Sequence, residues 1–267
     1  MKAISFIFLT FFVLSNYVMA DESVNKILKN IDELYRSKGS QGKIEMEVIT
    51  PDWSRTMKMD VWTKGMDYTF IRIKEPRKDK GVSSLKREDD VWNFFPKINK
   101  VIKVPPSMMM GSWMGSDFTN DDLVKESSLI KDYKTTNVKE SDGNIEITLV
   151  PHKNTVSLWG KILLVVEKKS ELPLKQEYFD ERNEKIRILF YRDVKKFGNR
   201  TIPATMELQP LTKKGHKTIN EICKNIIAPV WDKWGVNAVR TWSPVEGVIG
   251  NSYWIPSIEQ SCQASEI

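Results

Sequence analysis

The chain has 267 residues, and its 41 Lys and Arg residues outnumber its 35 Asp and Glu residues to give a formal net charge of +6. The basic residues are interspersed with acidic ones, whereas a nucleic-acid-binding surface usually shows clustered Lys and Arg. We therefore expect no nucleic-acid partner. A weakly basic protein can still make peripheral contact with anionic membrane surfaces.

Residues 1–20 predict a secretory signal peptide. Lys2 is followed by an apolar run from Ile4 to Leu14, and Ala20 ends a short segment of small or neutral residues. The run is shorter than the ~20 apolar residues of a spanning helix, and no later segment reaches that length. We expect an exported protein that is cleaved near Ala20. In an oxidising compartment Cys223 and Cys262, the only cysteines, could pair.

Residues 21–37 predict an amphipathic helix, because apolar residues recur every three or four positions. Much of the remaining sequence alternates apolar and polar residues, as in antiparallel strands with one covered face. These runs lie at 44–48, 57–61, 67–74, 81–88, 91–95, 100–104, 145–149, 172–180, 185–192 and 202–208. A further strand is expected at 160–168, which is apolar on both faces as in a central strand covered twice. A second helix is expected over 121–130. The expected fold class is mainly β with some α, one strongly curved antiparallel sheet with helices on its concave face.

The loop before the second helix has an unusual composition. Four Met residues and one Trp lie within 108–114, directly after two prolines. Loops normally lie at the surface, where apolar side chains are costly. Met is flexible and adapts to irregular apolar surfaces. The loop therefore either fills the protein's own core or forms part of a site for an apolar ligand.

The C-terminal residues 222–267 differ from the rest of the chain. They contain few charged residues, four Trp residues and no clear periodicity. We expect a signal peptide at 1–20, one domain at 21–221 and an atypical Trp-rich extension at 222–267. The extension is either an irregular packed segment or sequence not shaped for this fold, such as a frameshifted end.

No catalytic site is predicted. His152 and His216 lie in sequence typical of solvated turns, and neither is spaced with Cys or His as a metal ligand would be. The adjacent pairs Asp89-Asp90 and Asp121-Asp122 point in different directions on a strand or helix, so neither forms an acid–base pair. We expect no enzyme activity, no metal and no cofactor.

Two motifs carry a resemblance to a known family. They are Trp92-Asn93-Phe94-Phe95-Pro96 and Gly115-Ser116-Asp117-Phe118-Thr119-Asn120-Asp121-Asp122-Leu123. Over about residues 21–218 the chain resembles the LolA-like outer-membrane lipoprotein-sorting proteins. The resemblance implies an unclosed half β-barrel, helices over its concave face and a hydrophobic cavity between them. It also implies a periplasmic carrier of lipoprotein acyl chains or other lipids.

The resemblance further implies candidate partners, namely an inner-membrane transporter and an outer-membrane acceptor. An alternative with the same fold is an envelope sensor that binds lipids or lipoproteins and signals to a membrane partner. One departure concerns the end of the domain. Family members usually continue with an apolar strand after the turn at 213–217, whereas here that pattern fades after Ile219. The sequence therefore does not decide whether a final strand covers one edge of the sheet.

We predict that the Met-rich loop is a lid over the cavity, with Gly111 and Gly115 as hinges. The residues expected to line or gate the cavity are Met108, Met109, Met110, Trp113, Met114 and Phe118. Several strand residues are further candidates, although ordinary core is the simpler interpretation for them. These are Met46, Met59, Val61, Ile71, Phe94, Ile186 and Ile188.

Overall fold

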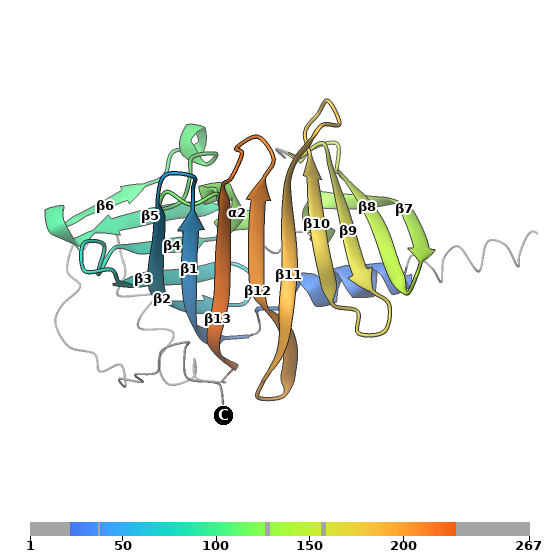
Figure 1. The fold of residues 1–267 in the computed structure, drawn as a ribbon, viewed down its shortest axis with the longest axis horizontal. Coiled ribbons are helices and arrows are strands. Elements are labelled where there is room, and N and C mark those ends of the chain that lie inside the picture. The colour runs from blue at the N-terminus through green and yellow to red at the C-terminus, as the bar shows by residue number, and fades with distance from the viewer. Residues whose placement is uncertain (1–21, 37, 126–128, 156–158, 228–267) are drawn as a thin grey trace, which may run out of the picture.

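The computed structural model describes residues 22–36, 38–125, 129–155 and 159–227. The chain forms one 13-stranded sheet in the order β6-β5-β4-β3-β2-β1-β13-β12-β11-β10-β9-β8-β7. Neighbouring strands are antiparallel, and the sheet curves strongly without closing into a barrel (Figure 1). This confirms the predicted fold class. The strands are β1 Ser40–Ile49, β2 Ser54–Lys64, β3 Tyr68–Glu75, β4 Ser83–Arg87, β5 Asp90–Phe95, β6 Lys100–Lys103, β7 Tyr133–Ser141, β8 Asn144–Pro151, β9 Lys161–Glu167, β10 Pro173–Phe179, β11 Lys185–Phe197, β12 Arg200–Pro210 and β13 Lys217–Ile227.

The strands that come first and last in the sequence, β1 and β13, pair with each other at the centre of the sheet. Ser40 on β1 lies opposite Ile227 on β13, and Ile49 lies opposite Lys217. From β1 the chain adds strands outward as far as β6, at one edge of the sheet. It then starts again at β7, at the other edge, and returns inward until β13 meets β1. A strand therefore does follow the turn at 213–217, although it is of mixed polarity.

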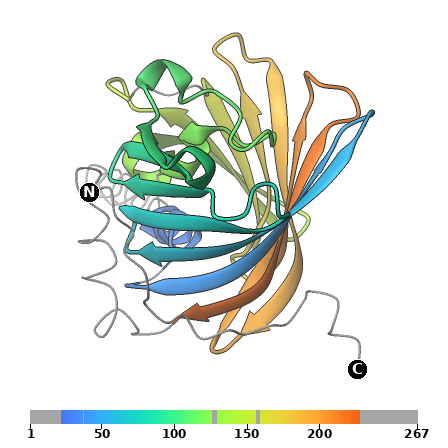
Figure 2. The ribbon, with the colours of Figure 1, turned by 90° about the vertical axis from the view of Figure 1, so that its left-hand side faces the viewer.

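A crossing connection joins the two edges of the sheet. It leaves β6 and contains the 3-10 helix η2 (Pro106–Met108) and the short helices α2 (Asn120–Lys125) and α3 (Leu129–Asp132). It then enters β7. Figure 2 shows this connection and the N-terminal helix (residues 22–32) on the concave side of the sheet. The Met-rich loop is thus part of the segment that passes in front of the sheet.

Two apolar clusters hold these covering segments against the sheet. The larger one joins the N-terminal helix, through residues such as Leu28, to the half of the sheet that contains Ile147 and Leu164. The smaller one joins β1, β2 and β3 to Trp113 of the crossing connection. Full burial of one large aliphatic side chain contributes roughly 1.5–3 kcal/mol. The two clusters therefore hold the covering segments in place on the sheet, and their positions determine where a space is left between the two layers.

Hydrogen bonds also attach the end of the N-terminal helix to β12. The Arg200 guanidinium donates to the backbone carbonyls of Arg36, at 3.0 Å, and Glu33, at 2.7 Å. The Tyr35 hydroxyl donates to the carbonyl of Pro203 at 3.0 Å. The Glu33 carbonyl also accepts the Arg36 N–H at 3.1 Å. Arg200 adds a second donor to Glu33 and supplies one to Arg36, so it acts as a C-terminal cap.

Two strands lie outside the runs that the alternation predicts. β7 is polar along most of its length and leaves Val138 42% exposed, as an edge strand can. β13 extends to Ile227, beyond the predicted domain boundary at 221, and pairs with both β1 and β12. The single helix expected over 121–130 is also different, because the structure has the two short helices α2 and α3 there.

Several predictions concern residues outside the described part of the chain. They include the signal peptide at 1–20, nearly all of the extension at 222–267, and Cys262. Cleavage near Ala20 and pairing of Cys223 with Cys262 therefore stay predictions. Among the described residues, none of the helices has the length and apolar character needed to cross a membrane.

Candidate functional site

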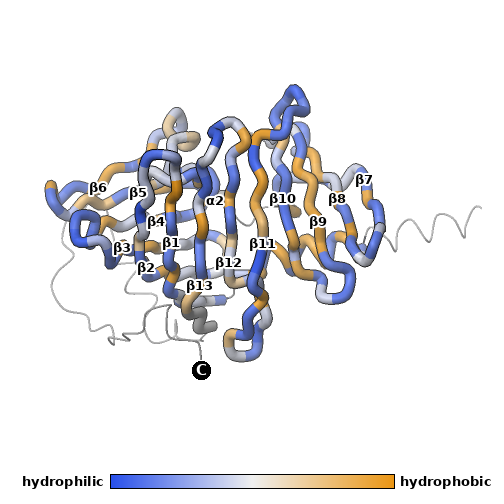
Figure 3. The backbone as a smooth tube through the Cα atoms, in the orientation of Figure 1, coloured by the Kyte–Doolittle hydropathy of each residue, from blue (hydrophilic) through white to orange (hydrophobic). Residues whose placement is uncertain are grey.

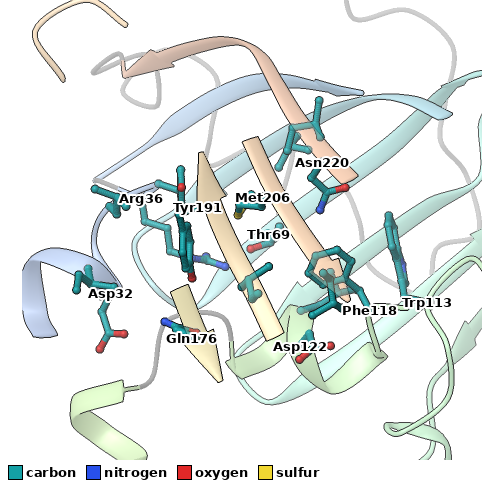
Figure 4. Close-up of a pocket in the computed structure, with 18 of the residues that line it drawn as sticks. Asp32, Arg36, Thr69, Trp113, Phe118, Asp122, Gln176, Tyr191, Met206 and Asn220 are labelled. Atoms are coloured by element: carbon teal, nitrogen blue, oxygen red, sulfur yellow. The ribbon is translucent and has the colours of Figure 1, made fainter. Parts of the chain in front are cut away.

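A cavity of about 190 Å³ lies between the concave face of the sheet and the segments that cover it (Figure 4). Its wall takes side chains from β1, β2 and β3, from β9 to β13, from the N-terminal helix and from the crossing connection. Because alternate residues of a strand share a face, each strand contributes every second residue. On β11, for example, the lining residues are Arg187, Leu189 and Tyr191.

Most of the wall is apolar. The residues from β1 to β3 include Met46, Met59 and Ile71, all of them buried. Leu189 and Met206 face them from β11 and β12. Met46, Met59 and Met206 give part of the wall an adaptable shape, since the unbranched thioether can occupy several conformations. Such a wall suits an apolar ligand better than a small polar one.

A buried salt bridge joins α2 to β11 in the same wall. The Arg187 guanidinium donates to the two carboxylate oxygens of Asp122 at 2.8 and 2.5 Å. Thr119 also donates to Asp122 through its backbone N–H, at 2.7 Å, and its hydroxyl, at 2.9 Å. The Asp122 N–H donates back to the Thr119 hydroxyl oxygen, so the two residues form a capping box at the start of α2.

The electrostatic effects on this salt bridge act in opposite directions. Burial raises the pKa of Asp122, but the charge and hydrogen bonds of Arg187 together with the Thr119 hydrogen bonds outweigh it and lower the pKa overall. The Arg187 guanidinium carbon lies 4.3 Å from the ring centroids of both Trp159 and Tyr178. Cation–π contacts at this range add to the attraction. The pair therefore stays charged inside a mainly apolar wall.

Asp32, at the end of the N-terminal helix, is a second acidic residue in the wall. Its carboxylate accepts hydrogen bonds from the backbone N–H groups of Leu129, at 3.0 Å, and Ile130, at 3.2 Å. Burial raises the pKa of Asp32 to about 6, although these two hydrogen bonds act against the rise. Asp32 thus ties the N-terminal helix to α3 and is poised to change charge under mildly acidic conditions.

Some buried polar atoms in the lining have no hydrogen-bond partner among the described residues. They include the Thr69 hydroxyl, the Asn220 side-chain oxygen and Nε of Arg187. Buried polar atoms normally have a partner, either in the protein or in water. These atoms are therefore available to water or to a polar group of a bound molecule.

Of the predicted site residues, six lie in the cavity wall. They are Met46, Met59, Val61, Ile71, Trp113 and Phe118. Trp113 is firmly held, because its indole Nε1 donates to the Ser84 hydroxyl at 2.9 Å and its side chain is 3% exposed. Nearby, the Asp117 N–H donates to the Thr218 hydroxyl at 3.0 Å. The structure thus fixes this part of the connection to β4 and β13.

None of the four Met residues of the loop lines the cavity. Met108 and Met110 are 59% and 44% exposed, so they face away from it. Met109 is half-buried and its carbonyl accepts the Asp121 N–H at 2.8 Å. Met114 packs against the cluster of β1 to β3. The loop therefore divides into an exposed first part and an anchored second part.

Three strand candidates also lie outside the lining. Phe94 is half-buried on β5, opposite Val101. Ile186 and Ile188 alternate with Arg187 and Leu189, which line the cavity. The side chains of Ile186 and Ile188 therefore lie on the convex face, and the expectation that they face the cavity has the wrong register. The inward face of β11 begins with a charged residue, which hides it from an apolar pattern.

The sequence-based search missed Arg187, Asp32 and Tyr178. Asp122 was considered only as part of the adjacent pair Asp121-Asp122 and of the motif at 115–123. The available signal for Arg187 was that it shares one face of the run at 185–192 with Leu189 and Tyr191. The adjacent residues Ile186 and Ile188 made the opposite face look like the buried one. Its partner is far away in the sequence, so no local spacing connects the two.

The comparisons with known proteins agree with this architecture. A protein-family model described as "Uncharacterized protein" matches residues 65–227, which is more than half of the chain. The chain belongs to this family. No curated protein matches it significantly.

Solved structures of other proteins share the fold of this chain. A LolA superfamily protein from Nitrosomonas europaea is 19% identical, with a TM-score of 0.65 over 78% of this chain and 95% of its own. A DUF1329 family protein from Desulfovibrio piger is 18% identical, with a TM-score of 0.68 over 81% and 98%. A putative outer membrane lipoprotein-sorting protein domain from Vibrio parahaemolyticus is 20% identical, with a TM-score of 0.63 over 79% and 96%. The chain shares the fold of these three proteins, as the resemblance implied.

Proposed function

We propose that this family member is a periplasmic carrier that binds lipoprotein acyl chains or other lipids in the cavity and carries them toward the outer membrane or a transporter. The observation that carries the proposal is the mainly apolar cavity between the curved sheet and its covering segments. An acyl chain gains roughly 0.8 kcal/mol for each CH₂ group that leaves water. The shared fold with a lipoprotein-sorting domain supports the same proposal.

The size of the cavity implies a change of shape on loading. Its 190 Å³ is less than the ~300–1,000 Å³ typical of ligand pockets. Trp113 and Phe118 of the crossing connection both occupy the wall. We propose that the cavity widens when this connection moves away from the sheet, with Phe118 leaving more readily because Trp113 is hydrogen-bonded to Ser84. The structure described here then corresponds to the closed form of the carrier.

The proposed role needs binding and release, without a chemical reaction. An inner-membrane transporter as donor and an outer-membrane acceptor are the proposed partners. Binding energy from an apolar wall is suited to transfer, because it does not demand a fixed geometry of the cargo. The unpartnered Thr69 and Asn220 oxygens lie in the same wall and are suited to a polar group at one end of the cargo.

The proposal is tested by filling the cavity. Val61 is half-buried on β2 and lines the cavity, whereas Ile188 is half-buried on the convex face of β11. Val61→Trp should weaken the binding of a fluorescent fatty acid by about tenfold or more, while Ile188→Trp should bind like the native protein. Mass spectrometry of extracts from the purified native protein identifies the lipid that co-purifies. Equal binding by the two variants would show that the ligand does not enter this cavity.

A further inference from the structure

One edge of the sheet gathers exposed apolar side chains. Ten large hydrophobic residues in the described part of the chain are exposed. Four of them lie within 98–110, namely Ile98 at 58%, Ile102 at 46%, Met108 at 59% and Met110 at 44%. We call residues 96–110 the β6 edge, since they comprise the 3-10 helix η1 (Pro96–Ile98), β6 and η2. Figure 3 shows hydrophobic and hydrophilic residues next to each other along β6.

The β6 edge is also basic. It contains Lys97, Lys100 and Lys103 and no acidic residue. Lys103 contacts Asp90 at 2.7 Å, whereas Lys97 and Lys100 are exposed. Positive charge next to exposed apolar side chains is the composition expected of an interfacial membrane-binding surface.

A neighbouring turn adds to the positive charge. Residues 76–81 lie against the β6 edge, since a Cβ atom on Gly81 would be 3.3 Å from Cγ of Pro96. The turn carries the exposed residues Arg77, Lys78 and Lys80. Its one acidic residue, Asp79, is already engaged at 3.7 Å by Arg55. The basic character therefore extends beyond the edge strand.

The opposite edge of the sheet lacks this combination. β7 is mostly polar, and Val138 is its one exposed large hydrophobic residue. It also carries Glu140, which contacts Lys168. Both edge strands leave backbone groups unpaired, but only β6 combines a basic surface with several exposed apolar side chains. An exposed edge alone therefore does not account for the composition of the β6 edge.

We propose that the β6 edge docks onto the surface of a bilayer that contains anionic phospholipids. The apolar side chains of Ile98, Ile102, Met108 and Met110 enter the boundary between headgroups and acyl chains. Lys97 and Lys100 remain among the anionic headgroups. The unpaired backbone groups of β6 stay in the hydrated headgroup layer, where water can satisfy them.

Docking at this edge would place the bilayer next to the segment that closes the cavity. Met108 and Met110 precede Trp113 in the same connection, and Asn120 Nδ2 donates to the carbonyls of Met108 and Gly111, each at 3.1 Å. A displacement of the exposed part is thereby transmitted to the start of α2. The docking proposal itself does not require the cavity to hold a lipid, so either proposal can fail without the other.

Sedimentation with lipid vesicles tests the proposal. The full chain should bind vesicles that contain phosphatidylglycerol about tenfold more tightly than vesicles of phosphatidylcholine alone, and added salt should weaken the binding. The variant Ile98→Glu/Met108→Glu should lose binding to both kinds. The matched control Val194→Glu/Leu211→Glu should bind like the native protein, because those side chains have similar exposed fractions of 56% and 49% but lie outside the β6 edge.

A second pair of variants tests the charge. Lys97→Gln/Lys100→Gln should bind anionic vesicles several times more weakly, whereas Lys134→Gln/Lys139→Gln on β7 should not. Circular dichroism and thermal melts show that each variant remains folded. Equal loss in both apolar variants, equal loss in both lysine variants, or no vesicle binding by the native chain would overturn the proposal. Capture of a protein through the β6 edge without vesicle binding would also overturn it.

Discussion

Asp122 and Arg187 meet in the cavity wall with two hydrogen bonds, at 2.8 and 2.5 Å, although they belong to different segments of the chain. Asp122 lies on α2 in the crossing connection, and Arg187 lies on β11 of the sheet. The salt bridge therefore joins the covering segment to the sheet directly at the cavity. Their contact makes α2 a fixed part of the closed structure.

Breaking this pair should be strongly destabilising. Arg187→Leu leaves the Asp122 carboxylate without its counter-charge, and a buried pair broken on one side typically costs about 3–5 kcal/mol. The double variant Asp122→Asn/Arg187→Leu should cost clearly less than the sum of the two single variants. Urea unfolding of the four proteins measures this, and additive costs would contradict the direct coupling.

The same pair has a predictable pH dependence. The pKa of Asp122 is lowered in the folded protein, so its stabilising effect is present above the ordinary aspartate pKa of 3.8 and is lost as the pH falls. Arg187→Leu should remove this part of the acid sensitivity. The measurement is the difference in free energy of unfolding between the native and variant proteins from pH 6 to pH 3.

Asp32 should have the opposite effect on stability. Its pKa is raised to about 6, so its contribution is greatest below pH 3.8 and declines as the pH rises through 6. The free energy of unfolding of Asp32→Asn, relative to that of the native protein, should therefore rise by up to about 3 kcal/mol between pH 4 and pH 7. Thermal melts of both proteins over this range test it. A constant difference would show that Asp32 has an ordinary pKa.

Ser84→Ala should destabilise the protein through Trp113. The substitution leaves the buried Trp113 Nε1 without its acceptor, at a cost of about 1–3 kcal/mol. Trp113→Phe removes the donor as well, so in that background Ser84→Ala should have a smaller effect. A double-mutant cycle by denaturant unfolding gives the coupling, which should be about 1 kcal/mol. No coupling would mean that the hydrogen bond does not hold the connection in place.

Arg200→Ala should loosen the end of the N-terminal helix. The carbonyls of Glu33 and Arg36 lose the guanidinium, although Glu33 keeps the Arg36 N–H as a donor, so the cost is about 1 kcal/mol for each bond or less. Arg200→Lys should rescue only part of the stability, because one ammonium group cannot reproduce the fork of the guanidinium. In Arg200→Ala, amide hydrogen exchange should accelerate in residues 28–36 more than in β12, relative to the native protein. Unchanged exchange in residues 28–36 would contradict the capping role.

The sequence predicted the regular part of the fold because strand alternation is a local signal. Met46, Met59, Val61 and Ile71 were placed on an apolar face by their spacing, and they lie together in the cavity wall. Alternation also has a limit, which β11 illustrates. There two exposed-side Ile residues alternate with Arg187 and Leu189, and a pattern that weighs only hydropathy selects the wrong face.

The partners of the polar residues could not be predicted, because they depend on contacts between distant segments. Asp32 meets the N-terminus of α3, and Asp122 meets β11, after the sheet has curved. The Met-rich loop shows a similar limit. Its composition indicated an unusual surface, but only the structure separates the buried Trp113 from the exposed Met108 and Met110.

The pairing of β1 with β13 has a consequence for how the chain can fold. The two strands lie at opposite ends of the domain sequence, so their contacts are the slowest kind to form. A chain that lacks β13 leaves both β1 and β12 without a neighbour, in addition to the free edges at β6 and β7. Such a partly emerged chain would expose two further strand edges at once, which favours association with other chains. The protein therefore depends on β13 to limit aggregation during its synthesis, and truncation before Lys217 should yield insoluble material.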